Sequence, residues 1–210
     1  MIQKPPVLDL AELLQQPVLQ VAEQLLGCVI TSRFDDQTVS IRLTEVEAYD
    51  GDRDPGSHAY RGQTPRNSSM FLSGGHLYVY RSYGIHWCAN VVCGPAGKAG
   101  GLLMRAGEVV SGIEVARKRR QATGVLRSDR DLARGPGRLG AALGMSDAVN
   151  GTWLLDGGVV SLHAPTQPGG LVGISTRTGV AGTGAPLPYR YYLADDPTVS
   201  SHRPHADASR

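Results

Sequence analysis

A strand that ends in two carboxylates is the feature of this sequence that most constrains its fold. Residues 38–48 alternate between apolar and polar side chains. The apolar positions are Val39, Ile41 and Leu43. Such an alternation is typical of a β-strand with one face against a hydrophobic core. Continuing the period of two places Glu45 and Glu47 on the core side, at the end of the strand.

Two carboxylates at the end of a buried face indicate a cleft. Desolvation in a cleft raises the pKa of a carboxyl group toward a value that suits a general base. The alternatives are a bulge in the strand or a strand end that frays into solvent. The alternation favours the cleft, but it does not choose between Glu45 and Glu47 as the reactive group.

The segment after this strand predicts a functional loop. Residues 50–69 contain too many Gly, Pro, Asp and Ser residues for a regular element. Long loops in compact domains are usually functional or disordered. This loop carries His58, Tyr60, Arg61 and Arg66, and we interpret it as functional. A histidine in a loop is most often a solvated residue, so His58 is of interest only because a buried carboxylate lies close in sequence.

Residues 75–88 form the densest aromatic cluster of a chain that is only 6% aromatic. Tyrosines here could belong to the core with their hydroxyls hydrogen-bonded, or they could form a platform for stacked bases beside the charged loop. A metal site built from His76, His86, Cys88 and Cys93 would lack the paired spacing of zinc sites. We therefore expect no metal.

The rest of the chain predicts a mixed α/β fold (α+β) in a single domain. With 210 residues, of which 41% are hydrophobic, the chain can bury a substantial core. Short strands throughout, with helices near the start and in the middle, favour a largely antiparallel β-sheet with packed helices. We expect the domain to span residues 1–194 and the tail at 195–210 to be unpacked and disordered. The expected strands are 28–34, 38–48, 77–80, 86–93, 101–106, 153–155, 159–162, 171–176 and 190–193.

Capping patterns place the helices. Asp9 and Glu12 form a capping box before the first helix, and Ser111 and Glu114 repeat it before a basic helix that reaches about Arg120. The other two helices are expected within residues 18–26 and 136–143. The Gly-Pro-Gly at 135–137 leaves backbone N–H groups free for an anion, although an ordinary helix start explains it equally well.

Composition gives a weaker signal about partners. The net charge is only +2, but 18 of the 21 basic residues are arginines, which suit bidentate phosphate contacts. Residues 117–138 contain eight basic residues against two acidic ones, a pattern that indicates a phosphate-facing patch. Arg105, near the end of an apolar strand, needs a carboxylate partner on a neighbouring strand.

Targeting signals are absent from the sequence. The first thirty residues lack a signal-peptide pattern, and no apolar run approaches the roughly 20 residues that cross a bilayer. The three cysteines, Cys28, Cys88 and Cys93, favour a reducing compartment over a disulfide scaffold. We expect a cytoplasmic protein without a membrane partner.

Several stretches of this sequence resemble the alkyladenine DNA glycosylase family, the mammalian-type 3-methyladenine DNA glycosylases. They are LLG at 25–27, TEVEAY at 44–49, QTPRNSSMF at 63–71, LYVYRSYGIHWCAN at 77–90, LLMRAGE at 102–108, GPGRLGAALG at 135–144 and the late YRYYLADDPTVS. The likeness covers nearly all of the chain except its two ends. It implies a mixed α/β domain with a curved antiparallel sheet.

The resemblance also implies catalytic roles. Glu47 matches the base that activates a water for attack on the sugar C1′ as the damaged base departs. His58 and Arg105 match residues that help to hold this water. The reaction implied is hydrolysis of an N-glycosidic bond, without a metal, another cofactor or a lyase lysine.

Other positions match residues that handle the DNA. Tyr49, His58 and Tyr80 match groups that stack on the flipped base, and Asn90 matches the asparagine that discourages guanine. Tyr83 matches the wedge that fills the vacated place in the duplex. We further expect Arg61, Arg66 and Arg138 to contact the DNA backbone. That set of ten residues is the predicted site.

The implied partner is double-stranded DNA with alkylated or deaminated purines, bound by a monomer in the nucleoid. Two departures from the mammalian pattern leave the lesion range open. The loop is one residue shorter near Tyr60, and Ile85 and His86 follow the wedge in place of bulkier residues. Two other function classes are a non-catalytic binder of damaged or distorted DNA and a hydrolase that uses Glu47 and His58 on another substrate.

Overall fold

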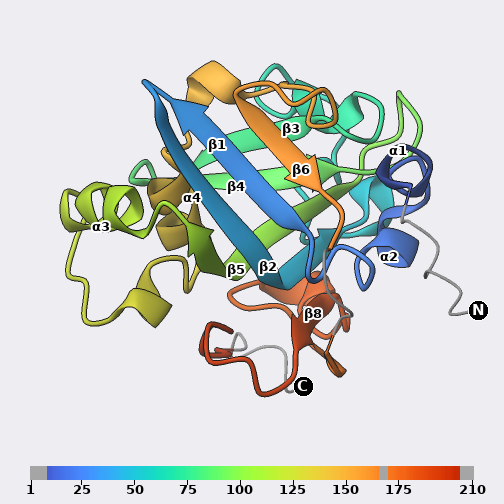
Figure 1. The fold of residues 1–210 in the computed structure, drawn as a ribbon. Coiled ribbons are helices and arrows are strands. Elements are labelled where there is room, and N and C mark those ends of the chain that lie inside the picture. Colours follow the sequence, from blue (N-terminus) through green and yellow to red (C-terminus); the bar gives the residue numbers. More distant parts are fainter. Residues whose placement is uncertain (1–8, 166–169, 204–210) are drawn as a thin grey trace, which may run out of the picture.

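An antiparallel sheet of eight strands forms the centre of the protein (Figure 1). The computed structural model describes residues 9–165 and 170–203. The main strand order is β3-β4-β5-β2-β1-β6, and β8 pairs with both β2 and β7. The strands are β1 (Val29–Phe34), β2 (Gln37–Tyr49), β3 (Leu77–Ser82), β4 (His86–Val92), β5 (Gly101–Ser111), β6 (Val160–His163), β7 (Val172–Ser175) and β8 (Arg190–Leu193). The predicted fold class is confirmed.

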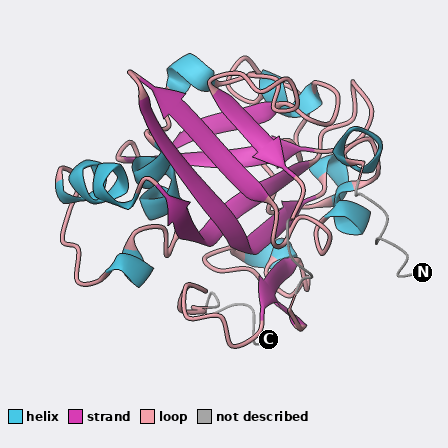
Figure 2. Ribbon diagram, in the orientation of Figure 1, coloured by secondary structure: helices cyan, strands magenta, loops and turns pink. Residues whose placement is uncertain are grey.

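In the described part of the chain, four α-helices lie around the sheet, with α1 and α2 toward the right of Figure 1 and α3 and α4 toward the left (Figures 1 and 2). They are α1 (Leu10–Leu13), α2 (Val18–Val21), α3 (Ile113–Gln121) and α4 (Pro136–Leu143). Short 3₁₀ helices cover Gly51–Arg53, Ser68–Phe71, Asp129–Asp131, Asp147–Val149 and Gly182–Gly184. No helix in the described part of the chain is long and apolar enough to span a membrane.

The predicted helix starts are right in one case and wrong in another. Asp9 caps α1, because its Oδ1 accepts a hydrogen bond from the backbone N–H of Ala11 at 2.9 Å. The Ser111 capping box does not form, because Ser111 still belongs to β5, and Gly112 is the N-cap of α3, in the left-handed region at φ 76°. The predicted strand at 153–155 is also wrong, since Trp153 makes only an isolated bridge to His76.

One extra residue in β2 turns the end of the strand over. The register between β2 and β5 shifts on both sides of Glu45, so Thr44 has no partner on β5. A bulge of one residue moves every later side chain to the opposite face of a sheet. Val46 and Ala48 therefore join the core. Glu45 and Glu47 are fully buried on the other face, which corrects the prediction that they continue the core-facing pattern.

The segment after β8 packs against the sheet, whereas we expected an unpacked tail from residue 195. Asp196 pairs with Arg42 at 2.8 Å, and Thr198 and Ser200 are buried. The backbone N–H of Ser200 donates a hydrogen bond to Glu45 at 2.7 Å. A buried carboxylate thus holds this segment in place. The remainder of the predicted tail, residues 204–210, lies outside the described residues.

Candidate active site

A cavity of about 630 Å³ opens beside the end of β2. Its walls come from β2, β3, β4, β5, the loop after β2 and the turn at residues 178–181. Predicted site residues that line it are Glu47, Tyr49, His58, Arg66, Tyr80, Tyr83, Asn90 and Arg105. The fold thus brings together residues that are up to about sixty positions apart in sequence. Their individual roles stay predictions.

Glu47 is the carboxylate that faces this cavity. Its Oε1 accepts a hydrogen bond from the backbone N–H of Thr178 at 2.7 Å, and its Oε2 accepts one from the Tyr49 hydroxyl at 3.1 Å. Burial raises the pKa of Glu47, and the charge of Glu45 adds to this rise, while Arg105 and the bonds from Thr178 and Tyr49 oppose it. A carboxylate with a raised pKa is a suitable general base.

Glu45 has a different environment, although it is also fully buried. Its carboxylate accepts hydrogen bonds from Arg105 Nε at 2.8 Å, from Arg190 Nε at 2.7 Å, and from both the N–H and the hydroxyl of Ser200 at 2.7 and 3.0 Å. Three of these donors bind Oε1 and one binds Oε2, so the fold supplies four hydrogen bonds to this carboxylate. Glu45 is also missing from the cavity wall. The two glutamates, which periodicity could not separate, differ clearly in the structure: Glu45 is an anchor.

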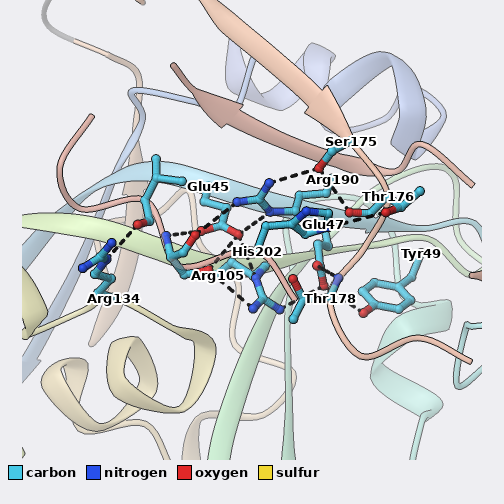
Figure 3. A network of polar contacts seen from close by, with 12 residues as sticks. Glu45, Glu47, Tyr49, Arg105, Arg134, Ser175, Thr176, Thr178, Arg190 and His202 are labelled. Carbon is cyan, nitrogen blue, oxygen red and sulfur yellow. Dashed lines mark hydrogen bonds and ion pairs between the residues drawn. The ribbon is translucent and has the colours of Figure 1, made fainter. Parts of the chain in front are cut away.

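Arg105 links the two carboxylates (Figure 3). Its Nε contacts Glu45, and its Nη1 lies 3.3 Å from Oε2 of Glu47. The register shift that follows Glu45 leaves Arg105 without a backbone partner on β2. The prediction that Arg105 has a carboxylate partner on a neighbouring strand is confirmed.

Aromatic rings form one wall of the cavity. The rings of Tyr78 and Tyr80 stack with centroids 5.5 Å apart, and the ring of His58 meets Tyr80 edge-on at 4.6 Å. Nδ1 of His58 lies 3.1 Å from the Tyr78 hydroxyl. Burial lowers the pKa of His58, and the charge of Arg66 lowers it further, which favours the neutral imidazole. No hydrogen bond joins His58 to Glu47 among the described residues.

Tyr83 stands at the tip of the β3–β4 hairpin and is 93% exposed. Its backbone adopts φ 50°, an uncommon conformation for an aromatic residue. Asn90 lies deeper in the cavity, where its Nδ2 donates a hydrogen bond to the carbonyl of Tyr78 at 3.2 Å. The hairpin therefore carries an exposed ring at its tip and a fixed amide nearer its base.

The two other predicted site residues lie outside this cavity. Arg61 lines an adjoining hollow of about 440 Å³ that shares His58 with the main cavity. Arg138 is about half exposed and lies 3.9 Å from Asp131. Arg66, which does line the main cavity, donates a hydrogen bond to the backbone carbonyl of Arg81.

The basic segment at 117–138 is less available for phosphates than its composition predicts. Arg117 pairs with Glu114 and Asp129, and Arg120 is buried with its Nε bonded to the carbonyl of Leu132. Arg134 donates to the carbonyl of Val199 at 2.8 Å. Much of the positive charge thus stabilises the fold.

Sequence reasoning missed the segment that supports Glu47 from the C-terminal half of the chain. Arg177 is fully buried, donates to Asp54 Oδ1 at 2.7 Å, and lies 4.6 Å over the ring of Tyr49. Its Nη1 also donates to the carbonyl of Ala48 at 2.9 Å. The signal that was available is the one used for Arg105, a charged residue beside a predicted strand. Among the described residues, no three His, Cys, Asp or Glu side chains are grouped so that they could hold a metal ion.

Comparisons with known proteins show which sequences this chain is similar to. A family model described as methylpurine-DNA glycosylase matches residues 12–197. A protein of Streptomyces avermitilis is 47% identical over 95% of this chain and 93% of its own length. Proteins of Leifsonia xyli (46% identical, 89% of both chains) and Frankia casuarinae (44% identical, 93% of both chains) are similar as well. All three are provisionally named 3-methyladenine DNA glycosylase.

Proposed function

The chain belongs to the methylpurine-DNA glycosylase family, and on this basis we propose that it is a monofunctional DNA glycosylase. It removes alkylated or deaminated purines from duplex DNA by hydrolysis of the N-glycosidic bond, which starts base excision repair. The observation that carries the proposal is the buried carboxylate of Glu47 in a cavity walled by aromatic rings.

Base recognition requires that the damaged nucleotide leaves the duplex. Extrusion costs a few kcal/mol, which stacking and edge contacts in a pocket offset. Tyr49, His58 and Tyr80 supply the stacking surfaces, and Asn90 contacts the base edge and disfavours guanine. Tyr83, exposed on its hairpin, enters the gap left in the stack.

Hydrolysis follows from the position of Glu47. The ionised carboxylate takes a proton from a water molecule, whose oxygen forms a bond to C1′ of the sugar. The bond from C1′ to the purine nitrogen breaks, and its electron pair leaves with the base. Alkylated purines carry a positive charge and leave as neutral bases. No lysine among the described residues lines the cavity, which supports hydrolysis without lyase chemistry.

Arg105 and Glu45 hold the carboxylate of Glu47, the general base, in position. The guanidinium keeps Glu47 oriented and offsets its charge, and Glu45 fixes the guanidinium from behind. His58 contributes a neutral ring beside the flipped nucleobase and a contact to the water, in line with its lowered pKa. We assign contacts with the DNA backbone to Arg61, Arg66 and Arg138. The proposed enzyme acts as a monomer on chromosomal DNA in the nucleoid.

A base-release assay tests the proposal. Purified protein should liberate free base from duplexes that contain 3-methyladenine, 7-methylguanine, hypoxanthine or ethenoadenine, and should leave an abasic site whose strand is not nicked. Glu47→Gln should bind the damaged duplex normally but excise about 10²–10⁴-fold more slowly, the range for loss of a general base. Binding without excision by the wild type would instead identify a non-catalytic binder. Activity that a chelator abolishes would identify a different hydrolase.

A further inference from the structure

A buried ion pair between Asp54 and Arg177 takes no direct part in the proposed reaction. Both side chains are fully buried. Arg177 Nη2 donates to Oδ1 of Asp54 at 2.7 Å and to the carbonyl of Gly184 at 3.1 Å, and its Nε is buried without a hydrogen-bond partner among the described residues. A buried ion pair is often no more stabilising than apolar residues of the same volume. Stability alone therefore does not explain this pair.

The position of Arg177 relates it to two hydrogen-bond donors of Glu47. Its Nη1 donates to the carbonyl of Ala48 at 2.9 Å, and its guanidinium carbon lies 4.6 Å from the ring centroid of Tyr49. The Tyr49 hydroxyl donates to Oε2 of Glu47 at 3.1 Å. Thr178, the next residue of the chain, donates its backbone N–H to Oε1 at 2.7 Å. Figure 3 shows Thr178 and the Tyr49 ring beside Glu47, so one guanidinium supports both donors.

The third donor of Glu47 is supported separately. Arg105 Nη1 lies 3.3 Å from Oε2 of Glu47, and Arg105 Nε is bound by Glu45 at 2.8 Å. Two buried ion pairs thus support the three donors. Glu45–Arg105 supplies one of them, and Asp54–Arg177 supports the other two.

We propose that Arg177 is a positioning residue for base excision, which, fixed by Asp54, holds the Tyr49 hydroxyl and the Thr178 N–H in hydrogen-bonding position on the carboxylate of Glu47. This inference rests on the proposed glycosylase function. Hydrogen bonds to the ionised form of a carboxyl group favour that form. Burial raises the pKa of Glu47, whereas Arg105 and the bonds from Thr178 and Tyr49 oppose that rise. When the two supported bonds are weakened, the pKa of Glu47 should rise further and less of the general base is ionised at a given pH.

Several elements contribute to the electrostatic environment of Glu47. The charged and titratable groups around it are Glu45 and Tyr49 on β2, Tyr80 on β3, Arg105 on β5, Arg190 on β8, His58 in the loop after β2, and Arg177. The charge of Arg177 itself favours ionised Glu47, and Asp54 offsets that charge. Removal of the Asp54 charge therefore separates two mechanisms. A direct effect of charge predicts a lower pKa of Glu47 in Asp54→Asn, whereas the loss of positioned donors predicts a higher one.

The pH dependence of excision tests the proposal. Arg177→Lys keeps the positive charge but replaces the planar fork that binds Asp54 and Gly184 by a single nitrogen. With excess enzyme and a hypoxanthine-containing duplex, its acid limb should lie roughly one pH unit above that of wild type, about the effect of one hydrogen bond to a charged group. Asp54→Asn should move the limb in the same direction. Arg120→Lys is the matched control, because Arg120 is also buried but binds the carbonyl of Leu132, so its limb should stay at the wild-type position.

A double-mutant cycle adds a second readout. Tyr49→Phe removes only the hydroxyl donor of Glu47 and should raise the limb by roughly one pH unit in the wild-type background. In the Arg177→Lys background the same substitution should add less than about half of that shift, because the hydroxyl is already out of position. Fully additive shifts would count against the positioning role.

Thermal unfolding checks that each variant is folded. Where Arg177→Lys does not fold, the double variant of Asp54→Asn and Arg177→Met removes both charges of the pair and should show the same rise of the limb. A limb at the wild-type position in a folded Arg177 variant, or an equal rise in Arg120→Lys, would overturn the inference while the proposed function stands. A lower limb in Asp54→Asn would also overturn it, because charge would then be the cause. A wild-type protein that releases no base would overturn the proposed function itself.

Discussion

Glu45 and Glu47 lie two positions apart on β2 and are both fully buried, yet only Glu47 faces the cavity. One guanidinium, that of Arg105, binds both of them. Glu45 accepts four hydrogen bonds from the fold, whereas Glu47 accepts three. The pair therefore divides into a structural carboxylate and a reactive one, and substitutions should separate stability from activity.

Glu45→Gln should destabilise the protein strongly. Removing this charge leaves Arg105 and Arg190 buried without a full counter-charge, which typically costs about 3–5 kcal/mol. Urea unfolding measures the loss. The control is Glu108→Gln, because Glu108 pairs with Arg42 at the half-exposed surface and should contribute less than about 1 kcal/mol. Similar losses in the two variants would contradict the anchor role of Glu45.

Glu47 should make stability depend on pH in the opposite sense to an ordinary ion-paired carboxylate. Because burial raises its folded-state pKa above the ordinary 4.5, the native state binds more protons than the unfolded state between those two values. The free energy of unfolding contributed by this group then falls as pH rises through that window. Thermal unfolding of wild type and Glu47→Gln over roughly pH 4–8 should show a smaller decline in the variant.

As pH is lowered, the excision rate should begin to fall at a pH above the ordinary pKa of glutamate. The reaction needs ionised Glu47, and its raised pKa moves the acid limb of the pH–rate profile upward. Single-turnover rates measured against pH give the limb. In His58→Gln the limb should keep its position even if the rate is lower. A limb that disappears with His58 would assign it to the imidazole.

Tyr83→Gly should improve stability and weaken DNA binding. The residue is 93% exposed and adopts φ 50°, so glycine relieves backbone strain of about 1 kcal/mol without loss of core packing. Loss of the ring removes the wedge and should raise the Kd for a hypoxanthine-containing duplex. Ile85→Ala provides a comparison, because Ile85 is exposed on the same hairpin. Equal binding by wild type and Tyr83→Gly would refute the wedge role.

Substitutions of Arg66, which we assign to a phosphate contact, and of Arg117, which is paired within the fold, should change the salt dependence of DNA binding differently. Arg66→Gln should lower the slope of log Kd against log salt by about 1, because one phosphate contact is lost. Arg117→Gln should leave the slope unchanged, since that guanidinium pairs with Glu114 and Asp129. Binding titrations at several salt concentrations measure both slopes. A lower slope in Arg117→Gln but not in Arg66→Gln would instead assign a phosphate contact to Arg117 on α3.

The sequence was sufficient to predict the fold class and most strands, because apolar alternation reports directly on burial. The bulge at Thr44 was only the less favoured alternative, since an extra residue in a strand leaves no distinct composition. The expected burial of Glu45 and Glu47 is correct, but the side of the sheet is not. The local alternation of apolar residues predicts that one face of a strand is buried, whereas the position of a bulge depends on the pairing with the neighbouring strand.

The support of the candidate site was harder to predict. Glu47 and Thr178 are 131 positions apart, and their contact joins a strand to a turn in another part of the chain. Arg177 and Arg190 gave no local sign of their partners, which are Asp54 for Arg177 and Glu45 for Arg190. Only the family resemblance, which places motifs on known positions, could group Glu47, His58 and Arg105 before the structure was available.

The bond from the Ser200 N–H to Glu45 has a consequence for biosynthesis. It closes a separation of 155 residues and joins one of the last described segments to the strand that carries the proposed base. During translation, β2 leaves the ribosome long before its carboxylate acquires this partner. A nascent or truncated chain that ends before Ser200 has an incomplete support for Arg105. Translation of the segment around Ser200 and completion of the site are thereby coupled in time.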